Sequence, residues 1–252
     1  MSRIDPEVVC LRDRPDLIPR VFAPELDAVW PEFMRQDRTA MLYYGEAAFE
    51  HYADCAFAAL EDDKVVGRAF AIPFAFGIED RRTLPDAGWD EVIRWGHEDR
   101  ILGRPPTTMS ALEIALLPKA RAPGSSLAML NALKRCARTK GFGELYAPVR
   151  PNQKHLTPQT PMSAYLEQRR EDGQLGDSWL RTHLGIGGEI VKLAPCSMTI
   201  VGTLAEWSQW TGVPFEQSGE IEIPGALVPV VVSAEHGYAV YVEPNVWIRH
   251  RT

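Results

Sequence analysis

Residues 116–130, LLPKARAPGSSLAML, combine residue types that could hold an anion. An apolar run ends at Pro118, basic side chains follow at Lys119 and Arg121, and Gly124 precedes a stretch with helical spacing. The first turn of a helix carries N–H groups without intrahelical partners, and the helix dipole favours negative charge there. Glycine also lets a ligand approach the main chain closely. The segment therefore predicts a diphosphate site, although the same residues would also make a plain capping turn.

Other phosphate-binding loops do not match the sequence. It contains no GxxxxGKS/T motif, and no GxGxxG motif follows a strand. The run Gly185-Ile186-Gly187-Gly188 lacks that spacing as well. No GxSxG elbow is present, so an unrelated α/β hydrolase or dinucleotide-binding enzyme has no supporting motif.

A strand is predicted directly before the anion-binding segment, over residues 109–117. Its alternation places Leu112, Ile114 and Leu116 on one face and Glu113 on the opposite face. A carboxylate in a strand that is otherwise apolar needs a reason. Glu113 is either a residue with a chemical role or a glutamate held in an ion pair or facing the sheet edge.

A helix is predicted after the segment, over residues 126–139, where apolar side chains recur at helical spacing. Ser125 or Ser126 is the expected N-cap, and Gly141 is the expected stop signal. A further strand follows at 143–149. Strand, loop, helix and strand together predict a βαβ-like unit.

The rest of the chain predicts further elements on both sides of this unit. Strands are expected at 7–12, 56–60, 64–75, 189–193, 227–232 and 238–248, with a hairpin at Asp62-Asp63. Helices are expected at 47–53, 178–184 and 204–211, and in proline-broken pieces over 16–34. Two polar, proline-rich segments near 76–106 and 151–177 are expected insertions, with helical pieces at 88–102 and 162–170.

The order of residues in the loop resembles the acyl-CoA signature of the GNAT superfamily of acyl-CoA-dependent N-acyltransferases. Leu116-x-Pro118 is followed by Arg121-x-x-Gly124-x-Ser126, where the family has Gln or Arg-x-x-Gly-x-Gly or Ala. Ser126 departs from this pattern, and Pro123 removes one N–H donor. The resemblance extends over the order of elements from about residue 7 to 193.

The resemblance implies an α/β (α+β) fold with a mixed, largely antiparallel sheet, a splayed central strand pair and flanking helices. Residues 1–193 would form the acyltransferase core and residues 194–252 a C-terminal extension packed on it, in one domain overall. An acyl-CoA would be the co-substrate. The residues implied to bind it are Leu116, Arg121, Ala122, Gly124, Ser125 and Ser126.

Acylation of an amine by a thioester requires a neutral amine and a proton for the departing thiolate. The resemblance makes Glu113 a candidate for the base or for a residue that binds the acceptor amine. Family members often carry a tyrosine acid where this sequence has Arg181. Tyr165 and His183 are the candidate substitutes, and each could equally be a surface or core residue. The two insertions are expected to contact the acceptor.

The composition of the chain argues against some classes of binding partner. The chain has 27 basic and 34 acidic residues, a formal charge of −7, which is the wrong sign for a protein that mainly grips nucleic acid. No stretch has the roughly 20 apolar residues of a membrane-spanning helix, so neither a membrane nor a nucleic acid is expected as a partner. The four cysteines show neither zinc-ligand spacing nor a disulfide pattern. We expect a cytoplasmic protein without a metal site, and the sequence leaves a homodimer open.

The sequence therefore predicts an acyl-CoA-dependent acyltransferase that moves an acyl group, most simply acetyl, to an amine of a small molecule by direct attack on the thioester. The alternative is a non-catalytic relative that binds acyl-CoA as a sensor or scaffold. The missing tyrosine and the altered glycine motivate that alternative.

Overall fold

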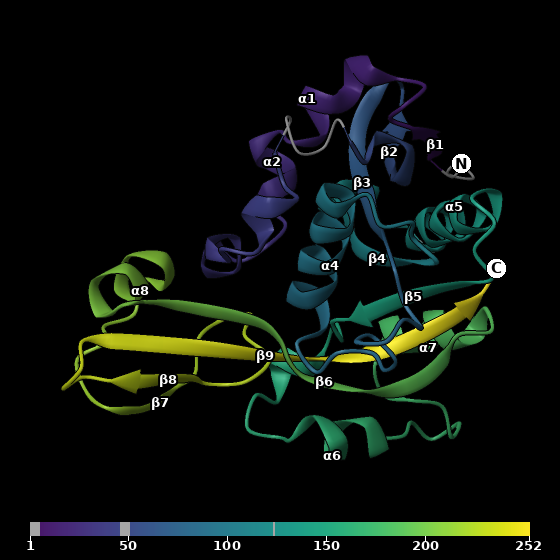
Figure 1. Ribbon diagram of the computed structural model, residues 1–252. Coiled ribbons are helices and arrows are strands. Elements are labelled where there is room, and N and C mark those ends of the chain that lie inside the picture. Colours follow the sequence, from purple (N-terminus) through teal and green to yellow (C-terminus); the bar gives the residue numbers. More distant parts are fainter. Residues whose placement is uncertain (1–5, 46–50, 123) are drawn as a thin grey trace.

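The computed structural model describes residues 6–45, 51–122 and 124–252. In this part of the chain nine strands form one sheet in the order β1-β2-β3-β4-β5-β9-β8-β7, and β6 pairs with β9 (Figure 1). All pairings are antiparallel except β4 with β5, as the predicted fold class requires. The strands are β1 Glu7–Cys10, β2 Ala56–Glu61, β3 Lys64–Phe74, β4 Thr108–Leu116, β5 Glu144–Val149, β6 Glu189–Thr203, β7 Gly219–Ile221, β8 Val230–Ser233 and β9 Tyr238–Arg251.

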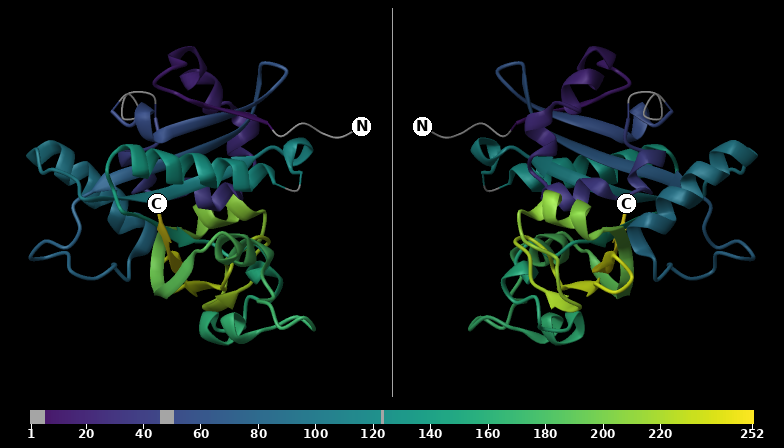
Figure 2. Two further views of the ribbon diagram at one scale, coloured as in Figure 1. Left: turned by 90° about the vertical axis from the view of Figure 1, so that its right-hand side faces the viewer. Right: turned by 90° about the vertical axis from the view of Figure 1, so that its left-hand side faces the viewer.

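Helices cover both faces of the strands β1–β4. The described helices are α1 Ile18–Val21, α2 Pro24–Asp27, α4 Gly88–Leu102, α5 Ser125–Thr139, α6 Met162–Glu167, α7 Ser178–Gly185 and α8 Leu204–Thr211. Figures 1 and 2 show α5 on one side of these strands and α1 and α2 on the other. The predicted break near Pro24 and Pro31 is confirmed, because only short helical pieces form there. The expected helix at 47–53 lies largely outside the described residues. No described helix has the length and apolarity needed to cross a membrane.

The predicted hairpin between β2 and β3 is confirmed. Asp62 and Asp63 both have positive φ, 48° and 60°, which is the backbone of a tight hairpin turn. Aspartate tolerates this conformation better than most residues. The turn directs β3 back along β2 and onward to β4, which carries the signature.

β4 and β5 run parallel but pair only at their beginnings. Met109 aligns with Leu145 and Ser110 with Tyr146, and these are the only pairs between the two strands among the described residues. On its other edge β5 pairs with β9 from Glu144 to Val149. The two central strands therefore diverge, as the splayed pair of the prediction requires.

A β-bulge interrupts β4. The register of β3 against β4 shifts between Phe70 and Ala71, which leaves Leu112 as the extra residue. Leu112 packs on the α1 side of the sheet, whereas Ile114 and Leu116 pack on the α5 side. The expectation that Leu112 shares a face with Ile114 and Leu116 is therefore wrong, because one inserted residue reverses the alternation of side chains.

Two apolar clusters fill the two sides of the sheet. The α1-side cluster includes Leu17, Val21, Phe33, Phe70, Trp89, Trp207 and Tyr241. The α5-side cluster includes Met129, Leu133, Leu145, Tyr165, Leu180, Val246 and Ile248. Both draw on β9, so the C-terminal residues belong to the same core as the N-terminal strands.

Helix α5 agrees closely with the predicted range, but its first residue is capped differently. Gly124, with φ of +96°, is the N-cap, and no side chain caps this end. The expectation of Ser125 or Ser126 as N-cap is therefore wrong, because the left-handed turn is made by glycine one residue earlier. The predicted stop is confirmed. Gly141 has φ of +82°, and the N–H of Phe142 donates to Ala137 O in a Schellman arrangement.

The C-terminal part of the chain contributes the longest paired strands. β6 pairs with β9 from Glu189 to Thr203, so the expected boundary at residue 193 falls inside β6. β9 lies between β6 and β5 over its second half. The strands at 189–193 and 238–248 are thus present and longer than expected, and β7 was not predicted.

Candidate active site

The predicted anion-binding loop is braced by hydrogen bonds of its own. After β4 comes a single 3-10 turn, Pro118–Ala120. The Arg121 Nε donates to Leu116 O at 3.1 Å. The N–H of Ser125 donates to Ala122 O at 3.1 Å, and the Ser125 hydroxyl accepts from Ala122 N at 3.4 Å. The loop is therefore held by Arg121 and Ser125 in front of the first turn of α5, while Pro123 lies outside the described residues.

The edge of β4 that faces β5 carries main-chain groups without a strand partner. Leu117 N donates to Val66 O on β3, and residues in a strand direct their main-chain groups alternately to the two sides. Ile114 and Leu116 therefore direct theirs away from β3 and into the gap, beyond the last pairing with β5. A gap of this kind suits an extended chain that pairs with the open edge. The Leu116 side chain itself packs against Gly67, where a Cβ would come within 2.4 Å of it.

The bulge in β4 is fixed by the first turn of α4. The indole Nε1 of Trp89 donates to Leu112 O at 2.9 Å. The N–H of Trp89 donates to Ser197 Oγ on β6 at 2.9 Å. Gly88 allows this approach, because a Cβ there would lie 2.2 Å from the same hydroxyl. The insertion helix thus ties β4 to β6 at the mouth of the gap.

Glu113 follows the bulge and is buried in an ion pair. Both of its oxygens accept from Arg68 on β3, at 3.0 and 3.1 Å, and only 3% of each side chain is exposed. The Trp30 indole donates to the same carboxylate at 2.5 Å. Arg68 also donates to Val21 O and to Asp27. The structure thus holds Glu113 in an ion pair, and its carboxylate is engaged on both oxygens.

A second buried ion pair lies beyond the end of β5. The Nε of Arg150 contacts both oxygens of Glu243 on β9, at 3.0 and 3.1 Å. The Tyr241 hydroxyl donates to Glu243 at 2.6 Å and Asn245 Nδ2 donates to it at 3.1 Å. Burial raises the pKa of Tyr241, and the nearby Glu243 charge adds to this. The phenol therefore keeps its proton and donates to Glu243.

Residues 30–33 connect the two ion pairs. Trp30 donates to Glu113, as described above. Phe33 packs edge-on against Tyr241 at 5.3 Å between ring centres. Between them Pro31 lies so close to Gly225 that a Cβ on that glycine would be 2.9 Å from it. This segment thus crosses from the β4 side to the β9 side on the α1 face of the sheet.

Tyr165 lies in α6 and its hydroxyl is committed to the start of α7. It donates at 2.8 Å to Asp177, the N-cap residue that also accepts from the main chain of Trp179 and Leu180. Burial raises the pKa of Tyr165, and the hydrogen bond to Asp177 adds to this. Tyr165 therefore releases its proton less readily than an exposed tyrosine.

His183 lies in α7 and faces His250 on β9, with 2.8 Å between Nδ1 of the first and Nε2 of the second. Burial lowers the pKa of His183 to about 3, with a smaller contribution from His250. Burial lowers the pKa of His250 to about 4, and the nearby Lys134 ammonium lowers it further. Both imidazoles are therefore neutral near pH 7.

The three candidate catalytic residues do not form one constellation. Glu113 contacts Trp30 and Arg68 on the α1 side of the sheet. Tyr165 belongs to the α5-side cluster, and His183 lies in α7, which packs on that cluster. The sheet therefore separates Glu113 from Tyr165 and His183.

Two buried carboxyl groups meet beside α4. Asp37 accepts from Thr39 N at 2.6 Å, and Asp90 accepts from Thr199 N at 3.1 Å. Burial raises the pKa of Asp90 to about 8, and the adjacent Asp37 contributes to this, while Arg94 acts in the opposite direction. Burial likewise raises the pKa of Asp37. The pair therefore holds one shared proton near pH 7.

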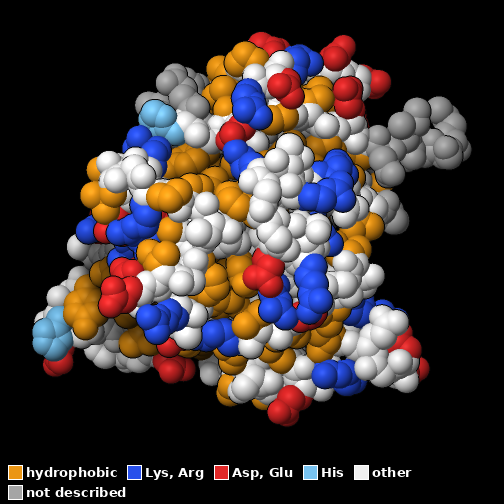
Figure 3. Space-filling model, turned by 45° about the vertical axis from the view of Figure 1, so that its right-hand side comes forward, with side chains coloured by type: hydrophobic (Ala, Val, Ile, Leu, Met, Phe, Trp, Pro, Cys, Tyr) orange, Lys and Arg blue, Asp and Glu red, His pale blue; other side chains and the backbone are white. Residues whose placement is uncertain are grey.

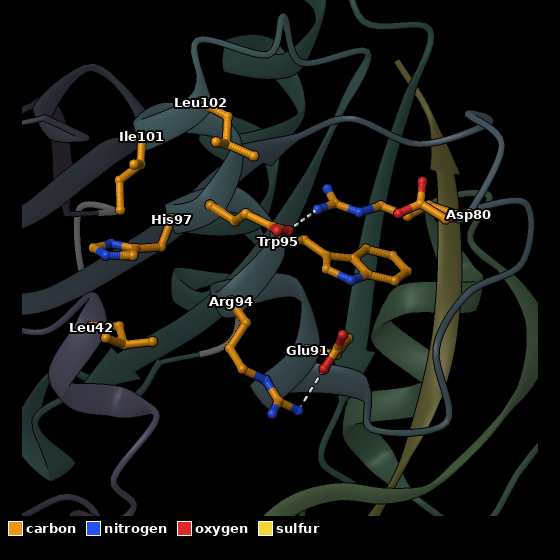
Figure 4. A pocket seen from close by; sticks show the side chains of 10 residues that line it. Leu42, Asp80, Glu91, Arg94, Trp95, His97, Ile101 and Leu102 are labelled. Atoms are coloured by element: carbon orange, nitrogen blue, oxygen red, sulfur yellow. Dashed lines mark hydrogen bonds and ion pairs between the residues drawn. The ribbon is translucent and has the colours of Figure 1, made fainter.

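The first insertion forms a groove of about 610 Å³ along the outer side of α4 (Figure 4). Arg81 is buried beneath it, where it binds Asp99 at 2.8 Å and stacks on the Trp95 ring at 4.8 Å. Asp80 and His97 are among the residues that line the groove. Arg81 and Trp95 thus support the insertion. The face drawn in Figure 3 intermingles acidic and basic side chains, so no single sign of charge covers it.

Sequence reasoning missed several residues of this region, and one of them had a signal. Arg68 is a lone charge in an apolar strand, as Glu113 is in the next strand, so the two could have been paired from the sequence. Trp30 and His250 had no such signal, because their partners are distant in sequence.

Comparison with known proteins gives relatives of this chain. No family model matches it. An arginine N-acetyltransferase of Aspergillus versicolor, avaD, is 32% identical over 266 residues, which cover 94% of this chain and 91% of the relative. The loading GNATL domain of CurA from Lyngbya majuscula has a similar fold, with a TM-score of 0.60 and 18% identity over 97% of this chain and 96% of that one.

Both similarities agree with the geometry described above. The fold contains the split between β4 and β5 and the loop leading into α5 that the resemblance implied. The protein is an N-acyltransferase that uses an acyl-CoA as its co-substrate. The chain belongs to the GNAT superfamily of acyl-CoA-dependent N-acyltransferases.

Proposed function

We propose that the protein transfers the acetyl group of acetyl-CoA to a nitrogen of arginine, or of a small molecule that presents an arginine side chain. The observation that carries this proposal is the 32% identity to an arginine N-acetyltransferase over nearly the whole length of both chains. An amine nitrogen attacks the thioester carbonyl carbon directly, the C–S bond breaks, and the thiolate of CoA leaves and takes up a proton.

The loop after β4 would hold the pyrophosphate. Gly124 brings the main chain close, and the N–H groups of Ser126 and Leu127 in the first turn of α5 are the donors. Arg121 would add positive charge through the guanidinium nitrogens that do not bind Leu116 O. Ser125 would act by shaping the loop, because its hydroxyl and N–H both contact Ala122.

The pantetheine would lie in the gap between β4 and β5. The main-chain groups of Ile114 and the N–H of Leu116 are the ones that an extended amide chain can pair with, since Leu116 O already accepts from Arg121. The bulge at Leu112, held by Trp89, would fix the end of the gap where the thioester reacts. Bulges commonly occur beside active sites for this reason.

The acceptor would approach from the α1 side, where residues 30–33 cross the gap. Glu113 would line this side with Trp30 and orient the acceptor through a charge that Arg68 keeps in place. We assign Tyr165 and His183 to the support of α7, because they lie on the opposite side of the sheet.

The test is an acceptor panel with acetyl-CoA, read by mass spectrometry of the products. Arginine should gain one acetyl group, while lysine, ornithine and putrescine should react at least tenfold more slowly. Preference for another amine would overturn the acceptor. CoA binding without turnover on any amine would favour the sensor or scaffold alternative.

The loop assignment is tested by two glycine variants of one helix. Gly124→Ala should raise the KM for acetyl-CoA about tenfold, because a methyl group strains the left-handed N-cap and crowds the anion site. Gly141→Ala imposes comparable strain at the other end of α5 and should leave that KM unchanged. Equal effects of the two variants would contradict the assignment.

The variant Glu113→Gln distinguishes a role as general base from a role in orienting the acceptor. A loss of turnover beyond a hundredfold with unchanged KM for acetyl-CoA would make the carboxylate a base. Under the orienting role proposed here, the KM for the acceptor should rise and kcat should fall less than tenfold. Unchanged turnover and KM would remove Glu113 from the site.

A cytoplasmic location, a monomer or homodimer in solution, and the absence of a nucleic-acid partner stay predictions from the sequence. The negative formal charge of −7 supports the last of these. Light scattering of the purified chain would give its oligomeric state.

A further inference from the structure

Three of the four cysteines, scattered through the sequence, meet in one place. Cys10 donates to Ala53 O at 3.5 Å and Cys136 donates to Asp54 O at 3.2 Å. Cys55 donates to the Asp54 carboxylate at 3.3 Å. The end of β1, the turn before β2 and the fourth turn of α5 thus bring three thiols around two consecutive residues.

Within this cluster Cys55 and Cys136 lie at the same residue, Asp54. The Cys55 thiol donates to the Asp54 carboxylate, the Cys136 thiol donates to Asp54 O, and both side chains belong to the α5-side apolar cluster. Cys55 is fully buried, while Cys136 retains 9% exposure. Cys136 is therefore the less buried, outer thiol of the pair, and Cys55 is the inner one.

Positive charge surrounds the outer thiol. Lys140, one turn further along α5, forms an ion pair with Asp54, and Arg12 lies 3.8 Å from the same carboxylate. The neighbouring Cys55 thiol and the Lys140 ammonium lower the pKa of Cys136, against burial and the Asp54 carboxylate, which raise it. The neighbouring Cys136 thiol and burial raise the pKa of Cys55 well above its ordinary value. Cys136 is thus the more readily ionised thiol of the two.

The fourth cysteine, Cys196, serves as a comparison for the pair. Cys196 is partly exposed and lies near Asp86 and Lys192. Burial raises the pKa of Cys196, and burial raises that of Cys10 as well. Cys196 is therefore a matched internal control, since it is accessible but has neither a thiol neighbour nor a lowered pKa.

We propose that Cys136 and Cys55 form a reversible disulfide site, with Cys136 as the attacking thiol and Cys55 as the resolving thiol. A cysteine whose pKa is lowered by a nearby cation, and which lies beside a second thiol, is the arrangement that oxidants modify selectively. The oxidant class is a hydroperoxide, of which hydrogen peroxide is the simplest. The inference does not depend on the acceptor proposed above.

The reaction balances in two steps. The Cys136 thiolate attacks one peroxide oxygen, the O–O bond breaks, and the leaving hydroxide takes up a proton to become water. The Cys55 sulfur then attacks the sulfenic acid on Cys136, the S–O bond breaks, and a second water leaves as the S–S bond forms. The two thiols lose two electrons and two protons to the peroxide. A dithiol restores them by exchange.

The experiment treats the full chain with one to five equivalents of hydrogen peroxide, followed by alkylation, digestion and mass spectrometry. One linked pair of peptides containing Cys55 and Cys136 should appear, and Cys196 should stay free. Reduction with dithiothreitol should return all four thiols. Equal oxidation of Cys196, or oxidation of Cys136 that never pairs with Cys55, would overturn the proposal.

Variants separate the two roles without relying on loss of the fold. Cys55→Ser should stop the reaction at a sulfenic acid on Cys136, trapped by a 1,3-dione probe. Cys136→Ser should give neither the probe adduct nor the disulfide, and Cys196→Ser should behave like the parent. Lys140→Met should slow alkylation of Cys136 at pH 7 about threefold or more, because the ammonium that favours the thiolate is gone. An unchanged alkylation rate would contradict the electrostatic part of the argument.

Discussion

Arg68 and Glu113 on the α1 side, and His183 and His250 on the α5 side, are both buried pairs of ionisable side chains. The first pair carries opposite charges and meets further donors and acceptors in Trp30 and Val21. The second pair shares one hydrogen bond, and the outer ring nitrogens of both histidines lack a partner in the described part of the chain. The comparison shows that burial preserves charge where an opposite charge supplies hydrogen bonds, and removes it where none is present.

Replacing Arg68 should cause the largest loss of stability among the changes to these two buried pairs. Arg68→Met leaves Glu113 buried without a counter-charge, and we expect the free energy of unfolding to fall by about 3–5 kcal/mol. Urea denaturation at pH 7 measures this. The double variant Arg68→Met with Glu113→Leu should recover most of the loss, because no unpaired charge remains. A single variant that loses less than about 1 kcal/mol would show that the pair is not effectively buried.

Acid should affect the neutral pair instead. The pKa values of His183 and His250 in the fold lie near 3 and 4, below the ordinary 6.5. Between pH 6.5 and 4 the unfolded chain binds protons at these histidines and the folded chain does not. The two imidazoles therefore contribute their full share to the free energy of unfolding above pH 6.5, and this contribution is lost as the pH falls toward 4. The loss by pH 5 should reach about 2 kcal/mol for each imidazole.

A histidine variant gives the control for this titration. His183→Asn should remove about half of the dependence of the unfolding free energy on pH between 7 and 5, because the buried His250 remains. His236→Asn, at an exposed position, is the control variant. Parallel curves for the parent and His183→Asn would mean that the imidazoles are not held neutral by the fold.

The carboxyl pair should respond to base. The pKa of Asp90 is raised to about 8, so the folded state binds a proton that the unfolded state has released above pH 4. Stability is therefore greatest at low pH and falls as the pH rises toward 8, by about 1.4 kcal/mol for each pH unit. Asp90→Asn keeps the bonds without the charge and should remove this slope in thermal melts between pH 6 and 8. An unaltered slope would place the shared proton elsewhere.

The smallest expected loss of stability comes from replacing Trp30, whose indole donates to Glu113. Trp30→Phe removes one donor to a carboxylate that Arg68 still holds, and we expect a loss of about 1 kcal/mol. In the Glu113→Gln background the same substitution should cost less. A double-mutant cycle from urea denaturation measures this coupling, and a coupling of zero would mean that the contact carries no energy.

Local signals explain how much of the fold the sequence predicted. Neighbouring residues determine the hairpin turn at Asp62-Asp63, the ranges of α4 and α8, and the end of α5 at Gly141. The bulge at Leu112 has no such signature, because it exists only relative to β3. The full length of β9 was missed for a similar reason, since its partners are β5, β6 and β8.

The candidate site also has a part that neighbouring residues determine and a part that depends on tertiary packing. The loop with Arg121 and Gly124 could be predicted from a contiguous motif, and it leads directly into α5. The proton-transfer candidates could not be placed, because whether Tyr165 and Glu113 share a face depends on which side of the sheet each packs. Pairwise distances across the sheet are tertiary information.

The central position of β9 has a consequence for the order in which the chain is made. β5 and β6 are both synthesised well before residues 238–251, and β5 has no antiparallel neighbour until those residues have left the ribosome. The growing chain therefore carries exposed strand edges from the synthesis of β5 until β9 has been added. Closure of the sheet therefore waits for β9, and a nascent chain that lacks β9 exposes the strand edges through which chains aggregate.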